Sequence, residues 1–147
     1  MWQLAPVAVR NGAACADKDS ATFDDVDDFT HPELTPLGRR ELNQERRLRA
    51  RVICAGCPVK TQCLEWALKE KVDTGTLGGL TPGDREQLLK GGAPHRADVR
   101  QKHHSVSHRH GDQMVRAFLG GASVTAVAQQ FAASRNSVLV EIRRTVV

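Results

Sequence analysis

The chain of 147 residues carries a formal net charge of +4, has 4% aromatic residues and contains no tyrosine, so it builds one ordinary domain or two very small ones, with a modest core that needs a further constraint. The N-terminal stretch MWQLAPVAVR lacks the basic start and long apolar run of a signal peptide, and no apolar run approaches the roughly 20 residues of a membrane span. We therefore expect a cytoplasmic protein with no membrane contact, whose reduced cysteines bind metal or do redox chemistry more often than they form disulfides.

The first predicted elements are a loop and a long helix. Residues 16–28 hold six aspartates and show no helical period, which indicates a loop. Thr35 followed by Pro36 offers an N-cap and a first-turn proline, and the next residues are rich in helix formers. The sequence therefore predicts a helix over about residues 36–55.

A second helix and a tight turn follow. Pro58 disfavours helical geometry at Cys57, so the long helix ends there. The next helix carries one inward face made of Val59, Cys63, Trp66 and Ala67. The run GTLGG predicts a tight turn, and TPGD predicts the cap of a short helix that ends at Gly91 and Gly92.

Residues 91–111 are typical of a linker. They show no apolar period and are rich in Gly, His and Arg. A metal site in the run HHSVSHRH, residues 103–110, is disfavoured because nothing there preorganises the histidines, and a flexible linker attracted to phosphate fits better.

Three further helices are predicted beyond the linker. Asp112 is expected to cap the first, with Val115, Phe118 and Leu119 on one side. Ser123 caps the second, whose apolar stripe consists of Val124, Val127, Ala128 and Phe131. The third contains Val138 and Ile142 one turn apart. Since no strand of convincing alternation and no internal repeat is present, the predicted fold class is all-α.

The four cysteines are unevenly spaced. Cys54 and Cys57 lie at a predicted helix end, and Cys63 lies in the second turn of the next helix, so three thiols can reach one point. Cys15 must fold back over residues 16–53, and only a strong bond such as metal to thiolate readily offsets the entropy of closing that loop.

Three kinds of site remain open on spacing alone. Structural zinc sites with four cysteines usually present two short-spaced pairs, whereas this chain has one pair, a gap and a distant single cysteine. An iron–sulfur cluster accepts more varied spacing and is larger than a lone ion, so the asymmetry favours a cluster over zinc. A redox dithiol at Cys54 and Cys57 is the third reading, although no flanking strand of the βαβ kind is present.

The first 90 residues resemble the WhiB-like transcription factors of actinobacteria and their phages. The likeness rests on residues and motifs that occur in the family's order: Trp2, Cys15, Ala50, the run CAGCPV from Cys54 to Val59, Cys63-Leu64, Trp66-Ala67-Leu68, the run GTLGGLT from Gly75 to Thr81, and Arg85.

This resemblance implies a small helical domain over residues 1–90 that holds a four-iron four-sulfur (4Fe-4S) cluster through Cys15, Cys54, Cys57 and Cys63. It also implies binding to region 4 of the primary sigma factor of RNA polymerase, and sensing of nitric oxide or oxygen through the cluster. Loss of the cluster is expected to loosen the surface that a partner reads.

The glycine turn departs from the family at one position. The family usually carries Trp between the glycines, whereas this chain has Leu77, so sigma binding is expected to be weaker or altered. Gly75, Gly78 and Gly79 still support the turn, which the resemblance assigns to the sigma contact.

Residues 112–147 form a separate, basic module. Residues 1–90 carry 13 basic and 14 acidic groups, whereas residues 91–147 carry 8 basic and 3 acidic groups, which favours a nucleic-acid partner for the C-terminal part. The run VAQQFAASRNSVLVEIRR resembles the helix-turn-helix of resolvase-like and sigma-like DNA-binding domains, with Ser134 as the cap of the second helix. Ala132 stands where glycine is favoured, so a left-handed turn residue there is expected to cost about 1 kcal/mol relative to glycine. A three-helix packing element without DNA is the alternative.

In the helix-turn-helix interpretation, Arg135, Asn136 and Ser137 start the recognition helix and face the major groove, where Arg pairs with guanine and Asn with adenine. Arg143 and Arg144 are expected to reach phosphates. The leading hypothesis is an iron–sulfur transcriptional regulator, not an enzyme, that binds the primary sigma factor and promoter DNA. A thiol-disulfide reductase using Cys54 and Cys57, or a zinc-stabilised DNA-binding protein, are the alternatives.

Overall fold

The computed structural model describes residues 4–92 and 109–146, and within these ranges every regular element is a helix, which confirms the all-α prediction. The chain divides into two compact units, residues 1–95 and 96–147. Trp2 and most of the predicted linker, including residues 103–108, lie outside the described residues. No helix within those residues is long and apolar enough to cross a membrane.

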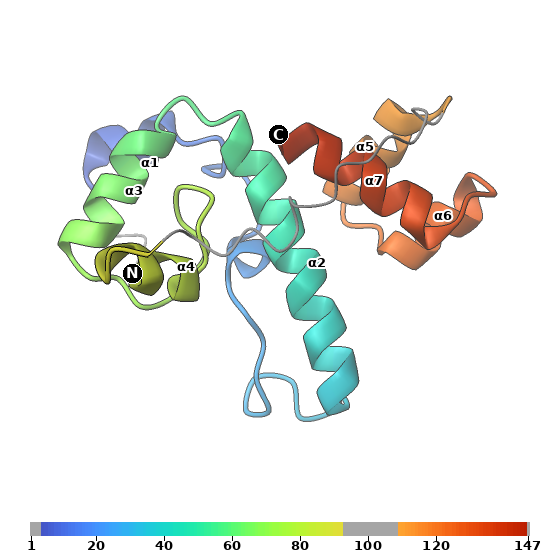
Figure 1. Ribbon diagram of the computed structural model, residues 1–147, viewed down its shortest axis with the longest axis horizontal. Coiled ribbons are helices and arrows are strands. Elements are labelled where there is room, and N and C mark those ends of the chain that lie inside the picture. Colours follow the sequence, from blue (N-terminus) through green and yellow to red (C-terminus); the bar gives the residue numbers. More distant parts are fainter. Residues whose placement is uncertain (1–3, 93–108, 147) are drawn as a thin grey trace. The chain divides into compact units, whose positions relative to one another are not determined.

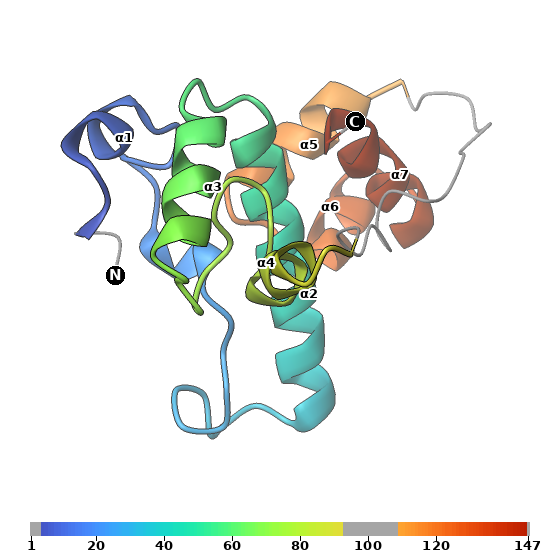
Figure 2. The same cartoon turned by 60° about the vertical axis from the view of Figure 1, so that its left-hand side comes forward.

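The long helix α2, Pro36–Ala55, is the longest helix of the first unit. Thr35 Oγ1 accepts the Gly38 N–H at 3.0 Å, so the predicted cap and first-turn proline are both confirmed. Its buried face consists of Leu48, Ala50, Val52 and Cys54. Figures 1 and 2 show α1, α3 and α4 toward the C-terminal half of α2, while its N-terminal half extends beyond them with the preceding loop alongside.

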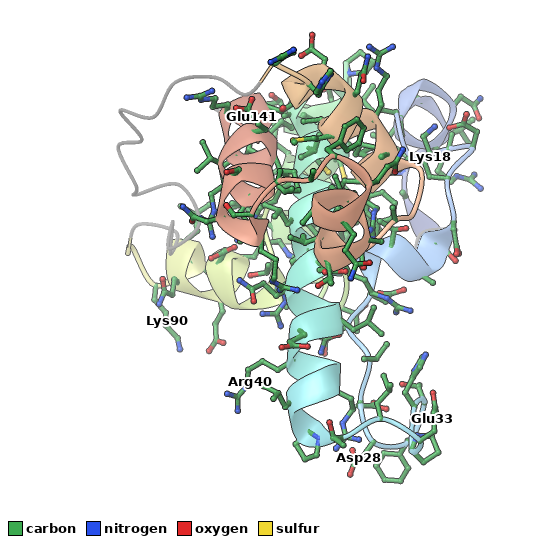
Figure 3. All side chains as sticks on the ribbon, turned by 90° about the vertical axis from the view of Figure 1, so that its right-hand side faces the viewer. Lys18, Asp28, Glu33, Arg40, Lys90 and Glu141 are labelled. Carbon is green, nitrogen blue, oxygen red and sulfur yellow. The ribbon has the colours of Figure 1, made fainter. Side chains whose placement is uncertain are left out.

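The predicted loop before α2 contains a short 3-10 helix, η2, Ser20–Phe23, which Asp19 caps and which packs on α2. The side chain of Asn43 exchanges two hydrogen bonds with the backbone of Val26, at 2.7 and 2.9 Å, and so holds the loop against α2. Figure 3 shows Asp28 and Glu33 on this loop beside the first turns of α2.

Three further helices complete the first unit. The sequence did not predict α1, Val7–Gly12, which precedes Cys15. The predicted second helix is α3, Lys60–Lys69, with Cys63 and Ala67 buried. The short helix is α4, Pro82–Leu89, which begins with the predicted Thr81 cap in a full capping box with Asp84.

Asp84 also ties α4 to α2. Its carboxylate accepts the Thr81 N–H at 3.0 Å and hydroxyl at 2.8 Å, and it pairs with the Arg51 guanidinium at 3.0 Å. Burial alone would raise the pKa of Asp84, but the Thr81 hydrogen bonds and the Arg51 charge outweigh burial and lower the pKa below its ordinary 3.8.

The lowered pKa of Asp84 predicts a pH dependence of stability. Because the folded-state pKa lies below the unfolded value of 3.8, the carboxylate stabilises the native state fully above that pH, and this contribution is lost as the pH falls through the folded-state pKa. In urea unfolding of the full chain, we expect Asp84→Asn to lower the free energy of unfolding at pH 7 by about 1–3 kcal/mol and to flatten its fall below pH 4. Asp17, which is 80% exposed, supplies the control: Asp17→Asn should keep the wild-type profile.

The second unit is a three-helix module. Helices α5, Gly111–Leu119, and α6, Val124–Gln130, both pack on α7, Arg135–Val146. Its largest fully buried side chains are Met114, Phe118, Val124, Val127, Val138 and Ile142. The Ser123 cap is confirmed, since its hydroxyl accepts the Ala126 N–H at 3.1 Å.

Two predictions for α5 were wrong. Asp112 lies inside the first turn, and the N-cap residue is His110, which makes no side-chain cap. The buried stripe contains Met114 and Phe118, while Leu119 is 36% exposed and Val115 only half-buried. Its first residue, Gly111, packs closely on α7, where a Cβ atom would collide with the carboxylate of the buried Glu141.

The turn between α6 and α7 carries the predicted strain. Ala132 has a φ of 49°, in the left-handed region where glycine is favoured. We expect Ala132→Gly to raise the free energy of unfolding of the module by up to about 1 kcal/mol. Thermal unfolding of the full chain measures this gain, and Ala133→Gly at the next position should show no gain.

Candidate metal centre

The four cysteines come from different parts of the first unit and line one cavity. Cys54 lies in the last turn of α2, Cys57 in the break after it, and Cys63 in α3, while Cys15 comes from the segment that follows α1. All four line a cavity of about 740 Å³. The predicted convergence of a remote cysteine on three neighbouring ones is therefore present in the fold.

A backbone contact holds the Cys15 segment against the other cysteines. The N–H of Ala14 donates to Cys57 Sγ at 3.4 Å across a separation of 43 residues. Because Ala14 precedes Cys15 directly, this bond fixes the position at which the chain enters the cavity. The sequence carried no signal for Ala14, since a backbone donor is independent of residue type.

Burial shapes the ionisation of the cysteines. It raises the pKa of Cys54 to about 12 and also raises the pKa of Cys15 and Cys63, and the charges of neighbouring cysteines add to each of these increases. Cys54 and Cys63 are buried, and Cys15 and Cys57 are half-buried. Four thiolates around one cavity need a strong positive charge among them, which metal coordination supplies.

The glycine turn covers two of the cysteines. Its centre is the pair of backbone hydrogen bonds between Leu77 and Leu80, at 3.0 and 3.1 Å. The backbone N–H groups of Gly79 and Gly78 lower the pKa of Cys54 and of Cys63, respectively. Such N–H donors stabilise thiolates bound to a metal.

Glycine is required at Gly78 for two reasons. Its φ is +57°, and a Cβ atom there would lie 2.6 Å from Cβ of Leu64 in α3. Gly75 and Gly79 also have positive φ. Leu77, at the position where a tryptophan was expected from the resemblance, is half-buried and lines the cavity.

The side chain of Arg85, in α4, stabilises the glycine turn through hydrogen bonds to its backbone and to the segment before it. Its side chain is 2% exposed and donates to four backbone carbonyls, those of Val72, Thr74, Gly75 and Leu80, at 2.7–2.9 Å. Burial lowers the pKa of Arg85, and the neighbouring charges of Cys63 and Asp84 act against that decrease. The sequence placed Arg85 in a family motif but assigned it no contact.

The cavity has room for a group larger than a single ion. The four cysteines line it, and Lys18 and Lys60 also border it. A cluster with a positive core would fit among the thiolates, and the two lysines suit the net negative charge that four thiolate ligands give such a cluster.

The residues predicted to bind DNA lie at both ends of α7. Arg135 and Asn136 are exposed, and the Ser137 N–H bonds to Ser134 Oγ at 3.0 Å, which confirms the predicted cap. The Arg135 guanidinium donates to Thr125 Oγ1 of α6. At the other end, Arg143 is half-buried and Arg144 pairs with Glu141 at 2.8 Å.

Comparison with known proteins identifies relatives for the first unit. The family described as "Transcription factor WhiB" matches residues 10–88. "Transcriptional regulator WhiB1" of Mycobacterium tuberculosis is 32% identical over 55% of this chain and 83% of its own length. "Transcriptional regulator WhiD" of Streptomyces coelicolor is 35% identical over 60% of this chain and 64% of its own. No solved structure matches the chain.

The name of a third relative refers to redox chemistry. "Redox-responsive transcriptional regulator WhiB3" of Mycolicibacterium smegmatis is 39% identical over 44% of this chain and 64% of its own length. The family match spans more than half of the chain and contains the segment that supplies each cavity-lining cysteine. On these grounds the chain belongs to the WhiB family of transcription factors.

Proposed function

We propose that this chain is an iron–sulfur transcriptional regulator in which Cys15, Cys54, Cys57 and Cys63 hold a four-iron four-sulfur cluster. The first unit binds region 4 of the primary sigma factor, the C-terminal module contacts promoter DNA, and the cluster responds to an oxidant or to nitric oxide. The single observation that carries the proposal is the cavity lined by one remote and three neighbouring cysteines. The named relatives are transcriptional regulators, which supports a regulatory rather than an enzymatic role.

The cluster is the part of the proposal with the most support. WhiB family proteins carry iron–sulfur clusters, and this chain has one cysteine for each iron of a four-iron cluster. When bound, such a cluster supplies one-electron redox chemistry and reactivity toward small oxidants. The chain itself supplies four thiolate ligands, the Ala14 N–H that donates to Cys57, and the backbone N–H groups of Gly78 and Gly79, which lower the pKa of Cys63 and Cys54.

The experiment that tests the cluster is anaerobic purification followed by iron and sulfide analysis and a visible spectrum. The proposal expects a brown protein with about four irons and four sulfides per chain, one iron for each thiolate. A colourless protein with one zinc would replace the proposal with the zinc-stabilised alternative. A colourless, metal-free protein with thiol-disulfide activity would replace it with the reductase.

The sigma contact is proposed for the glycine turn, residues 75–80. Arg85 fixes one side of the turn, and the other side packs beside a cysteine, since a Cβ atom on Gly79 would lie 3.7 Å from Cβ of Cys54. Removal of iron by a chelator should therefore weaken binding of the full chain to the purified sigma factor. Unchanged binding after iron removal would separate the turn from the cluster.

The DNA contact is proposed for α7 and its preceding turn, because Arg135 and Asn136 are exposed at its start. We expect Arg135→Ala to change the preferred DNA sequence, at a cost of about 1–3 kcal/mol on the best site. Arg143→Ala should weaken binding to all sequences and reduce the slope of log affinity against log salt by about one.

Fluorescence anisotropy with a panel of duplexes at several salt concentrations measures both effects. Arg144→Ala is measured beside Arg143→Ala, because Arg144 was also predicted to reach phosphate and pairs with Glu141. If neither Arg135→Ala nor Arg143→Ala changes DNA binding, the module is a packing element.

The reductase alternative is less compatible with the site. Reactive cysteines have lowered pKa values and partial exposure. Burial instead raises the pKa of Cys54 to about 12, and its side chain faces the cavity beneath the glycine turn. This environment is unlike that of a reactive cysteine.

A further inference from the structure

The end of α1 lies against the break between α2 and α3. A Cβ atom built on Gly12, the last residue of α1, would lie 2.8 Å from Cγ1 of Val59. Real Cβ atoms do not approach other carbons this closely. Val59 follows Cys57 by two residues and is the N-cap residue of α3, so the contact lies beside the cysteines.

The three residues after Gly12 lead directly into the cavity. Ala13 is buried and lines the cavity, Ala14 donates its N–H to Cys57 Sγ at 3.4 Å, and Cys15 lines the same cavity. The position of Gly12 therefore sets how closely the following segment approaches Cys57. A side chain at this position would push that segment away from Val59.

We infer that Gly12 is a positioning residue for the fourth cluster ligand. Its missing side chain allows α1 to rest on Val59, and this contact brings Cys15 within reach of the cluster held by the other three cysteines. The inference rests on the proposed function, because it presumes that all four cysteines ligate one cluster.

A set of four full-length variants tests the inference: Gly12→Ala, Val59→Ala, the double variant, and Gly83→Ala. The last is the matched control. Gly12 and Gly83 both lie in helices, so both changes gain helix propensity, but a Cβ atom on Gly83 meets nothing within 4 Å.

The readouts are the iron and sulfide content after anaerobic purification, the rate of cluster loss to a chelator, and the electron paramagnetic resonance spectrum. We expect Gly12→Ala to lose its cluster about tenfold faster than the wild type, the consequence of an overpacked contact. It should also accumulate a cluster with one iron fewer, the signature of a lost fourth ligand. General destabilisation of the protein would remove the whole cluster, and no cluster with one iron fewer would accumulate.

Rescue distinguishes the Val59 contact from any other effect of the methyl group. The double variant should regain wild-type retention, because Val59→Ala removes the atoms that the new Cβ atom would meet. Gly83→Ala should match the wild type. Circular dichroism of the iron-free proteins should show equal helix content in all four variants.

Three results would overturn the inference: wild-type retention in Gly12→Ala, failure of the double variant to restore retention, or loss of the whole cluster with no intermediate iron content. Failure of the proposed function looks different. In that case the wild-type protein itself contains no iron and sulfide after anaerobic purification.

Discussion

Replacement of Cys15 by serine is expected to remove the cluster from the purified protein and with it binding to the sigma factor. Serine keeps the size of the side chain but is a poor ligand for iron, so the cluster loses the one ligand that comes from outside the α2–α3 pair. Closure of residues 16–53 through the cluster is also lost, and this closure is worth about 4 kcal/mol in the chain-entropy model.

Iron analysis and chemical denaturation of the full chain measure the two parts of this expectation. The iron-free forms of the wild type and Cys15→Ser provide the control, and they should unfold at the same denaturant concentration because the change acts through the cluster. A Cys15→Ser protein that keeps full iron content and sigma binding would show that Cys15 is not a ligand, and the proposed function would then fail.

Replacement of Arg85 by methionine is expected to be the most destabilising single change in the α4 region. The guanidinium satisfies four backbone carbonyls of the segment from Val72 to Leu80, and the side chain is 2% exposed. Methionine fills similar space but leaves those oxygens without their donor. Each buried acceptor left unsatisfied costs about 1–3 kcal/mol, and partial entry of water limits the total to about 3–5 kcal/mol.

Denaturant unfolding of the cluster-free protein measures this loss without interference from iron. Lys90→Met on the same helix is the matched control. It removes a cation of similar length whose partner, Glu86, is also exposed, so little change is expected. Arg85→Lys should behave like Arg85→Met, because one ammonium group does not span four carbonyls in a planar fork. Wild-type stability of Arg85→Met would show that the turn holds its shape without the guanidinium.

Both predictions, for Cys15 and for Arg85, concern the glycine turn and the cysteines beside it. The turn formed by residues 75–80 is held by Arg85 on one side and packs beside Cys54 on the other, where a Cβ atom on Gly79 would lie 3.7 Å from the cysteine Cβ. Under the proposed function, a change in the cluster would therefore act on the packing of this turn. That would give a local route from the state of the cluster to the surface proposed to contact the sigma factor.

Local chemistry determined most of the helices from the sequence. Thr35, Thr81, Ser123 and Ser134 each cap a helix in the way that their positions predicted, because a hydroxyl oxygen next to unpaired backbone N–H groups acts over one turn of chain. Ala132 takes up the predicted left-handed conformation for an equally local reason. The start of α5 was mispredicted: its first residue, Gly111, packs closely against Glu141, which lies 30 positions further along the chain.

By itself the sequence determined which residue types are available at the site: four cysteines, a turn that only glycine can form, and a proline that separates two helices. Tertiary structure alone decided which atoms meet. The hydrogen bond from Ala14 to Cys57 and the contact between Gly12 and Val59 join segments distant in the chain, and Arg85 gathers four backbone carbonyls from the loop before its helix. Backbone N–H and C=O groups are the same in every residue, so contacts of this kind leave no pattern in the sequence and exist only once the chain has folded.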